Sequence, residues 1–173
     1  FTWTADDDMY SPIFFETVFR SLKKFGSTSC IFTSFTKDNS YLETTKINDT
    51  KIQHLAGKEF LQRYLSRSIK LLGSYAFFEK NYLQRIGGIK KLGDGFGPCS
   101  DNLLVIRAGV LKKVIFVDAP SVFFFRHDES ISFASADIHA LSSAHEELLL
   151  ESVEIFKCEE LVEDFCSNLL LLT

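Results

Sequence analysis

The stretch KKVIFVDAPSVFFFRH, residues 112–127, decides the fold of this chain. Branched and aromatic side chains fill both of its halves, which is typical of strands, and Ala119-Pro120 separates the two. The sequence therefore predicts strands at 112–118 and 121–127. Because strands alternate with helices elsewhere along the chain, we expect an α/β fold with a mixed sheet near residues 113–127, flanked by helices.

The spacing of apolar residues predicts the other elements. A helix is expected to begin at the cap pair Ser11-Pro12, to place Phe15, Phe19 and Leu22 together with Val18 and Phe25 on its apolar face, and to end at Gly26. The remaining predicted elements are the end of a buried strand at 1–5, a strand at 28–35, an irregular segment at 36–57, a helix at 58–71, a short strand and helix within 73–89, a glycine-rich loop at 92–101 that leads into a helix, and helical structure from about 136 to the end.

Composition excludes several classes of protein. An apolar fraction of 46% over 173 residues is enough for one ordinary core and argues against disorder. A net charge of −4 leaves no basic surface for duplex nucleic acid, and no apolar run approaches the roughly 20 residues that cross a bilayer. The four cysteines lack metal-binding spacing, so we expect them to be reduced in a cytoplasmic protein.

Three consecutive aspartates, Asp6, Asp7 and Asp8, form the first candidate site. They follow a predicted strand and precede a predicted helix, which places them at the carboxyl edge of a sheet, where open α/β folds bind ligands. Such a cluster suits a divalent cation held together with substrate phosphates. The alternative is a solvated turn whose negative charges favour the helix N-terminus.

The second candidate is the pair Ser100-Asp101, which follows the glycine-rich loop and precedes an apolar helix. Either residue is a good helix cap. Alternatively, Asp101 is a general base that takes a proton from an attacking hydroxyl group.

The third candidate is the pair Arg126-His127, which follows an aromatic strand. A single histidine at a strand end is commonly a structural hydrogen-bonding residue. The functional alternative is a pair that faces a phosphate or a metal ion.

Taken in order, these motifs resemble the inverting GT-A-fold glycosyltransferases of the family 2 type. The resemblance covers residues 1–133 and rests on ADDDMYSP (5–12), GSYAFFEKNYLQRIGGI (73–89), SDNLLVIRAG (100–109) and FFRHDESIS (124–132). It implies a partial GT-A-like sheet that forms the acceptor-side half of a transferase domain, with 134–173 as a C-terminal helical extension.

The resemblance also implies roles for individual residues. Asp7 would hold Mn²⁺ or Mg²⁺ on the donor diphosphate together with His127, while Asp6, Asp8 and Arg126 would help to bind that cofactor and donor. Asp101 would be the catalytic base. The chain departs from the family pattern at three positions. Ala5 stands where the family has an acidic residue, Ser100 stands where Glu is usual, and Phe125 stands at the usual Arg position.

The implied function is metal-assisted transfer of a sugar from a nucleotide-diphosphate donor to a hydroxyl group of a glycan acceptor. Because the family's donor-binding half precedes the aspartate cluster, we expect the chain alone to be inactive and its apolar faces to favour homo-oligomers. Peripheral association with the inner face of a membrane is a further expectation.

Two alternatives stay open. The first is a non-catalytic assembly or acceptor-binding module that kept the fold and lost the chemistry, which Ala5, Ser100 and the expected absence of the donor-binding half favour. The second is a Mg²⁺-dependent phosphatase, since Asp6 and Asp8 have its D-x-D spacing, but Tyr10 stands where such enzymes usually have Thr or Val.

Overall fold

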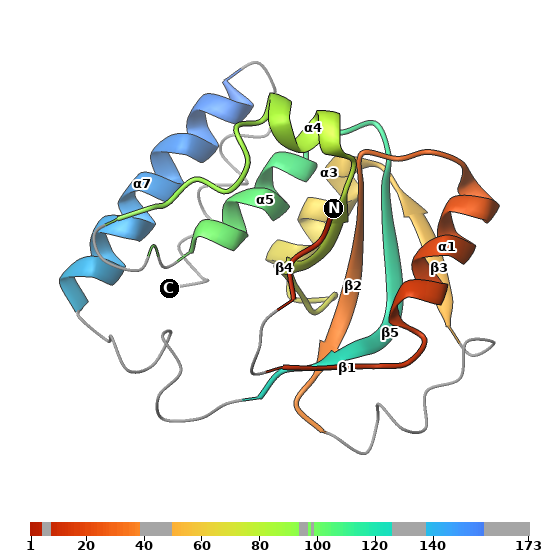
Figure 1. Ribbon diagram of the computed structural model, residues 1–173. Coiled ribbons are helices and arrows are strands. Elements are labelled where there is room, and N and C mark those ends of the chain that lie inside the picture. The colour runs from red at the N-terminus through yellow and green to blue at the C-terminus, as the bar shows by residue number, and fades with distance from the viewer. Residues whose placement is uncertain (5–7, 39–49, 94–96, 98, 126–137, 158–173) are drawn as a thin grey trace.

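The structure is a computed structural model that describes residues 1–4, 8–38, 50–93, 97, 99–125 and 138–157 (Figure 1). It is a mixed α/β fold, as the sequence predicts. The elements follow in the order β1 (Met9–Tyr10), α1 (Phe14–Phe25), β2 (Cys30–Thr36), β3 (Lys51–Leu55), α3 (Gly57–Leu65), β4 (Leu71–Phe78), α4 (Lys80–Arg85), α5 (Ser100–Ala108), β5 (Val114–Phe123) and α7 (Ile138–Phe156).

A curled sheet is built around β5. This strand runs parallel to β2 on one side, and β2 in turn pairs antiparallel with β4. On its other side β5 pairs antiparallel with β3 along Val114–Asp118 and with β1 at Val122 and Phe123. The short strand β1, which directly follows Asp8, therefore lies at the carboxyl end of β5.

The prediction of two strands within 112–127 is wrong, because β5 continues through Ala119-Pro120 as a single strand. Its register against β2 shifts there, since Thr33 pairs with Val117 but Ser34 pairs with Pro120. Two residues of β5 therefore bulge out of the ladder. A bulge tolerates proline, which has no N–H group to donate.

Three further boundaries differ from the prediction. The structure assigns no strand to residues 1–4, although Phe1 exchanges two backbone hydrogen bonds with Phe78. The segment predicted to be irregular contains β3, whose sequence KIQHL shows little alternation because only one end of it is buried. The helix predicted for 58–71 ends at Leu65, and Arg67 adopts a positive φ of 58° where the chain turns toward β4.

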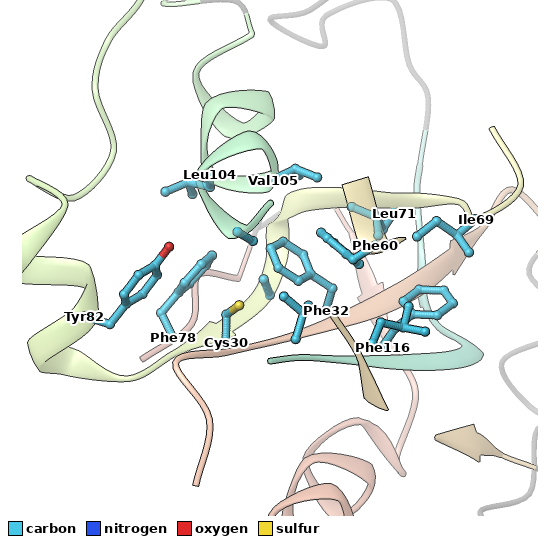
Figure 2. Close-up of a cluster of buried hydrophobic side chains, with 14 residues drawn as sticks. Cys30, Phe32, Phe60, Ile69, Leu71, Phe78, Tyr82, Leu104, Val105 and Phe116 are labelled. Carbon is cyan, nitrogen blue, oxygen red and sulfur yellow. The ribbon is translucent and has the colours of Figure 1, made fainter. Parts of the chain in front are cut away.

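Alternate residues of the central strands face two separate cores. On one face, Phe32 and Phe116 pack with α3 and α5 in the largest hydrophobic cluster, shown in Figure 2. On the other face, Ile31 and Ile115 pack with Val18 of α1. The sheet is therefore covered by α1 on one side and by α3 and α5 on the other (Figure 1).

The prediction for the apolar face of α1 is wrong in part. Phe14 and Val18 are buried, but Phe15, Phe19 and Leu22 are 54%, 69% and 37% exposed. The buried face instead includes Thr17 and Ser21. These small residues can face the sheet because their hydroxyl groups donate to backbone carbonyls of the preceding turn, at 2.5 and 2.7 Å.

The last described helix, α7, packs on the outer side of α5 (Figure 1). Its residues Ala144, Leu148 and Phe156 share a hydrophobic cluster with Leu103 and Ile106 of α5. Glu151 adds ion pairs to Lys90 at 2.5 Å and to Arg107 at 3.7 Å. None of the helices in the described ranges combines the length and apolar character needed to cross a membrane.

Candidate active site

The carboxylate of Asp8 joins three parts of the chain. Its Oδ2 accepts a 2.5 Å hydrogen bond from the hydroxyl group of Tyr75 on β4, and its Oδ1 accepts one of 3.0 Å from the backbone N–H of Phe125, just beyond β5. Asp8 is half-buried, and Tyr75 is 2% exposed. Asp8, the GSYAFF strand and the end of the aromatic strand thus meet at one place.

A bulge in β4 shapes this place. Phe32 of β2 pairs with Ala76, but the next pair is Ser34 with Leu71, so residues 72–75 of β4 face Thr33 alone. The Thr33 hydroxyl group donates to the carbonyl of Tyr75 at 2.9 Å. The bulge takes the backbone of Gly73 and Ser74 out of the ladder with β2, so their N–H groups need other acceptors.

The side chain of Asp101 supplies that acceptor. Asp101 lies in the first turn of α5, and the backbone N–H groups of Gly73 and Ser74, as well as those of Asp101 and Asn102, donate to its carboxylate. Burial nevertheless dominates and raises the pKa of Asp101 above its ordinary value of 3.8, since the hydrogen bonds oppose the shift without overcoming it.

Gly73 lets the helix come this close to the strand. A Cβ atom at position 73 would lie 2.0 Å from the backbone oxygen of Asp101, which is far inside van der Waals contact. Only glycine therefore fits between β4 and the start of α5. Asp101 therefore lies against the same short stretch of β4 that carries Tyr75, the partner of Asp8.

Polar neighbours surround Asp101. The amide of Asn102 donates to the hydroxyl oxygen of Tyr64 at 2.9 Å. Burial and then the charge of Asp101 raise the pKa of Tyr64, and the same two causes raise the pKa of Cys99 to about 11. Both side chains therefore keep their protons at neutral pH, and the Tyr64 hydroxyl group can donate to a nearby oxygen.

Ser100 does not cap α5 with its side chain, although the sequence allowed this. The N-cap residue is Cys99, which has a φ of 67°, and its side chain makes no capping hydrogen bond to the first turn of α5. The Ser100 hydroxyl group instead donates to the carbonyl of Gly97 at 2.6 Å and accepts from the N–H of Leu92 at 3.1 Å. It fixes the ends of the glycine-rich loop.

The structure brings Asp8 and Asp101 to one stretch of β4, while Asp6, Asp7, Arg126 and His127 lie outside the described residues. Within the described ranges, no group of three or more His, Cys, Asp or Glu side chains could hold a metal ion. Both oxygens of Asp8 accept hydrogen bonds, which suits a residue that holds the cluster in place. The assignment of metal and cofactor ligands stays a prediction.

Sequence reasoning missed the roles of Gly73, Tyr75 and Tyr64. A glycine inside an apolar strand is a signal for a bulge or for close approach of another backbone, and Gly73 does both. No comparable signal marks Tyr75 or Tyr64, because their partners are 67 and 38 residues away in the sequence.

Comparisons with protein families, with curated proteins and with solved structures find no match to this chain.

Proposed function

We propose that the protein containing this chain transfers a sugar from a nucleotide-diphosphate donor to a hydroxyl group of a glycan acceptor, with inversion at the anomeric carbon. We further propose that its sheet is the acceptor-side part of a GT-A-like domain. The observation that supports this best is the convergence on β4, where Gly73 contacts Asp101 and Tyr75 holds Asp8.

Asp101 is the base in this proposal. Inverting transfer needs a carboxylate that removes the proton of the acceptor hydroxyl group as its oxygen attacks. The raised pKa strengthens Asp101 as a proton acceptor, and the four backbone N–H groups fix its direction. Tyr64 and Asn102 stand beside it as donors that can orient the acceptor.

Asp8 has a positioning role. By binding both Tyr75 and the backbone of Phe125, it fixes the start of β1 against the end of β5. The neighbouring residues Asp7 and His127 are those assigned by the resemblance to Mn²⁺ or Mg²⁺, which would neutralise charge on the departing nucleoside diphosphate. Asp6 and Arg126 would contribute to the same binding.

A non-catalytic assembly or acceptor-binding module is the second candidate. The same hydrogen bonds favour it, because a carboxylate that accepts four backbone N–H groups also serves to anchor α5 on β4. In that case the contact between Asp101 and Gly73 is purely structural, and the protein has no use for a nucleotide.

Incubation of the gene product that contains residues 1–173 with uridine and guanosine diphosphate sugars separates the two candidates. The transferase is expected to release the nucleoside diphosphate only with Mn²⁺ or Mg²⁺, and Asp7→Asn is expected to weaken calorimetric binding of the metal and nucleotide together. If calorimetry shows no nucleotide binding to the unaltered protein, the assembly module is the better account.

A further inference from the structure

The segment that leads from α4 toward α5 runs along α7, in the direction opposite to that helix (Figure 1). Lys90 of this segment forms an ion pair with Glu151 of α7, and Gly93 lies against Ala144, about two turns nearer the start of the helix. Leu92, between these two contacts, is fully buried in the hydrophobic cluster that α7 shares with α5. Helix α7 therefore holds this segment by charge, by packing and by burial.

The contact between Gly93 and Ala144 leaves no room for a side chain. A Cβ atom at position 93 would lie 2.8–2.9 Å from the N, Cα and Cβ atoms of Ala144, and Gly93 has a positive φ of 66°. The backbone of the segment thus touches the helix directly. Ala144 is itself fully buried, so a larger side chain at position 144 must displace its neighbours, of which Gly93 is one.

Two hydrogen bonds of Ser100 connect this segment to the start of α5. The backbone N–H of Leu92 donates to the hydroxyl oxygen of Ser100 at 3.1 Å, and that hydroxyl group donates to the carbonyl of Gly97 at 2.6 Å. Ser100 is the first residue of α5, and Asp101 follows it. A short series of contacts therefore joins Ala144 to the turn that carries Asp101.

The direction of the Asp101 carboxylate depends on this turn. Two of its four backbone N–H donors, those of Asp101 and Asn102, belong to the turn itself, and the other two belong to β4. A shift of the turn would move the first pair of donors relative to the second pair. Misplacement of a reacting group by about 1 Å can cost about a hundredfold in rate.

We propose that α7 positions Asp101, with Ala144 acting through Gly93 and Ser100. The C-terminal helix is then part of the candidate site and not an addition to a complete domain. The position of Asp101 is a property of the fold, whereas its consequence for proton transfer rests on the proposed transferase function.

The reactivity of Cys99 in the full chain measures the position of this turn. Cys99 directly precedes Ser100 and is half-buried, and burial and the charge of Asp101 raise the pKa of its thiol from 9.0 to about 11. Because the thiolate is the reactive form, a turn that moves toward solvent should be alkylated faster. Ala144→Leu is expected to raise the rate of Cys99 alkylation by iodoacetamide about tenfold or more, measured by peptide mass mapping.

Cys30 provides an internal control in the same sample. It is 1% exposed in the core of the sheet, so it should stay unreactive while the chain is folded. Ala144→Gly leaves room for Gly93, and Val18→Ala lowers stability in the core beside α1. Both variants should keep the Cys99 rate within about twofold of the original. A Cys99 rate that Ala144→Leu leaves unchanged while Cys30 stays protected, or that Val18→Ala raises equally, overturns the proposal.

Ser100→Ala tests the route without requiring α7 to accept a larger side chain. The change removes both hydrogen bonds of the hydroxyl group with little change in volume, and it is expected to raise the Cys99 rate about threefold or more. Combined with Ala144→Leu, it should react no faster than the faster single variant, because both changes release the same turn. Effects that multiply would show that the two residues act separately, which contradicts the route through Ser100.

Turnover by the gene product separates this proposal from the proposed function. In Ala144→Leu we expect kcat to fall about tenfold or more, while KM for the nucleotide sugar stays within about twofold, because Asp101 would act on the acceptor. An unchanged kcat beside a faster Cys99 would show that Asp101 keeps its position and would overturn the proposal. If the unaltered protein transfers no sugar, the transferase function is wrong, and the alkylation rates alone decide whether α7 holds the turn of Asp101.

Discussion

The hydroxyl group of Tyr75 donates a 2.5 Å hydrogen bond to Oδ2 of Asp8, across 67 residues of sequence. Through this bond Asp8 is tied to the bulged stretch of β4 that also receives Asp101. The two acidic motifs that sequence reasoning selected separately therefore depend on one strand for their positions.

Loss of this hydrogen bond should reduce stability. Tyr75→Phe removes the donor from a half-buried carboxylate, and a hydrogen bond to a charged group is worth about 2 kcal/mol of unfolding free energy. The control Tyr82→Phe removes a longer bond of 3.4 Å to the carbonyl of Arg107 and should cost less than about 1 kcal/mol. Urea denaturation measures the unfolding free energy of both variants. If the two variants lose the same amount, the hydrogen bond between Tyr75 and Asp8 does not stabilise the fold more than an ordinary one.

The close approach at Gly73 predicts a steric effect. Gly73→Ala places a methyl group 2.0 Å from the backbone oxygen of Asp101, so α5 must move, at a cost of about 3 kcal/mol. Gly26→Ala is the control, because its Cβ meets nothing within 4 Å and only its positive φ of 73° opposes the change, at about 1 kcal/mol. Thermal unfolding that ranks Gly26→Ala as the more damaging would contradict the described contact.

Helix α7 should unfold together with the rest of the described core. Leu148 is 2% exposed and packs with α5, so Leu148→Ala should lower the unfolding free energy by about 3 kcal/mol. Leu150, two residues later, is 61% exposed, and Leu150→Ala should change it by less than about 0.5 kcal/mol. Hydrogen exchange in which Leu148→Ala releases only α7 would instead support the separate extension predicted from residue 134.

The raised pKa of Asp101 predicts a pH dependence of stability. The folded carboxyl group keeps its proton to a higher pH than the unfolded one, whose pKa is near 3.8. As pH rises above that value, unfolded chains lose the proton first, so the unfolding free energy falls until pH passes the raised pKa and then levels off. Asp101→Asn should lack this fall.

Urea denaturation of the unaltered protein and of Asp101→Asn over a pH series measures this fall. Contributions from the other carboxylates cancel in the difference between the two unfolding free energies. A constant difference across the acidic range would show that Asp101 titrates at its ordinary pKa.

Sequence patterns predicted much of the fold because they depend on local chemistry. The branched run at β2, the short strand and helix before Gly87-Gly88, and α7 all follow from periodicity and turn residues. The errors arose where distant contacts decide. Ala119-Pro120 predicts a break, yet a bulge against β2 lets β5 continue. Packing of α1 on β5 decides which face of the helix is buried, and Thr17 and Ser21 tolerate burial there because hydrogen bonds within the helix satisfy their hydroxyl groups.

The candidate site shows the same division. Asp8 could be selected because acidic residues between a predicted strand and a helix mark an edge where ligands bind, and Asp101 because it follows a glycine-rich loop and begins a helix. Their actual surroundings could not be predicted, since the bulge of β4 that receives Asp101 results from a register shift against β2. Asp6, Asp7, Arg126 and His127 stay predictions.

Turnover of the nucleotide sugar by Asp101→Asn tests the central claim most directly. We expect the rate of transfer by the gene product to fall by about 10²–10⁴-fold while nucleotide binding is kept, because a general base contributes that much. Asp118→Asn, at an exposed aspartate of β5, is the control and should transfer at the original rate. Equal rates for Asp101→Asn and the unaltered protein would contradict the assignment of Asp101 as the base.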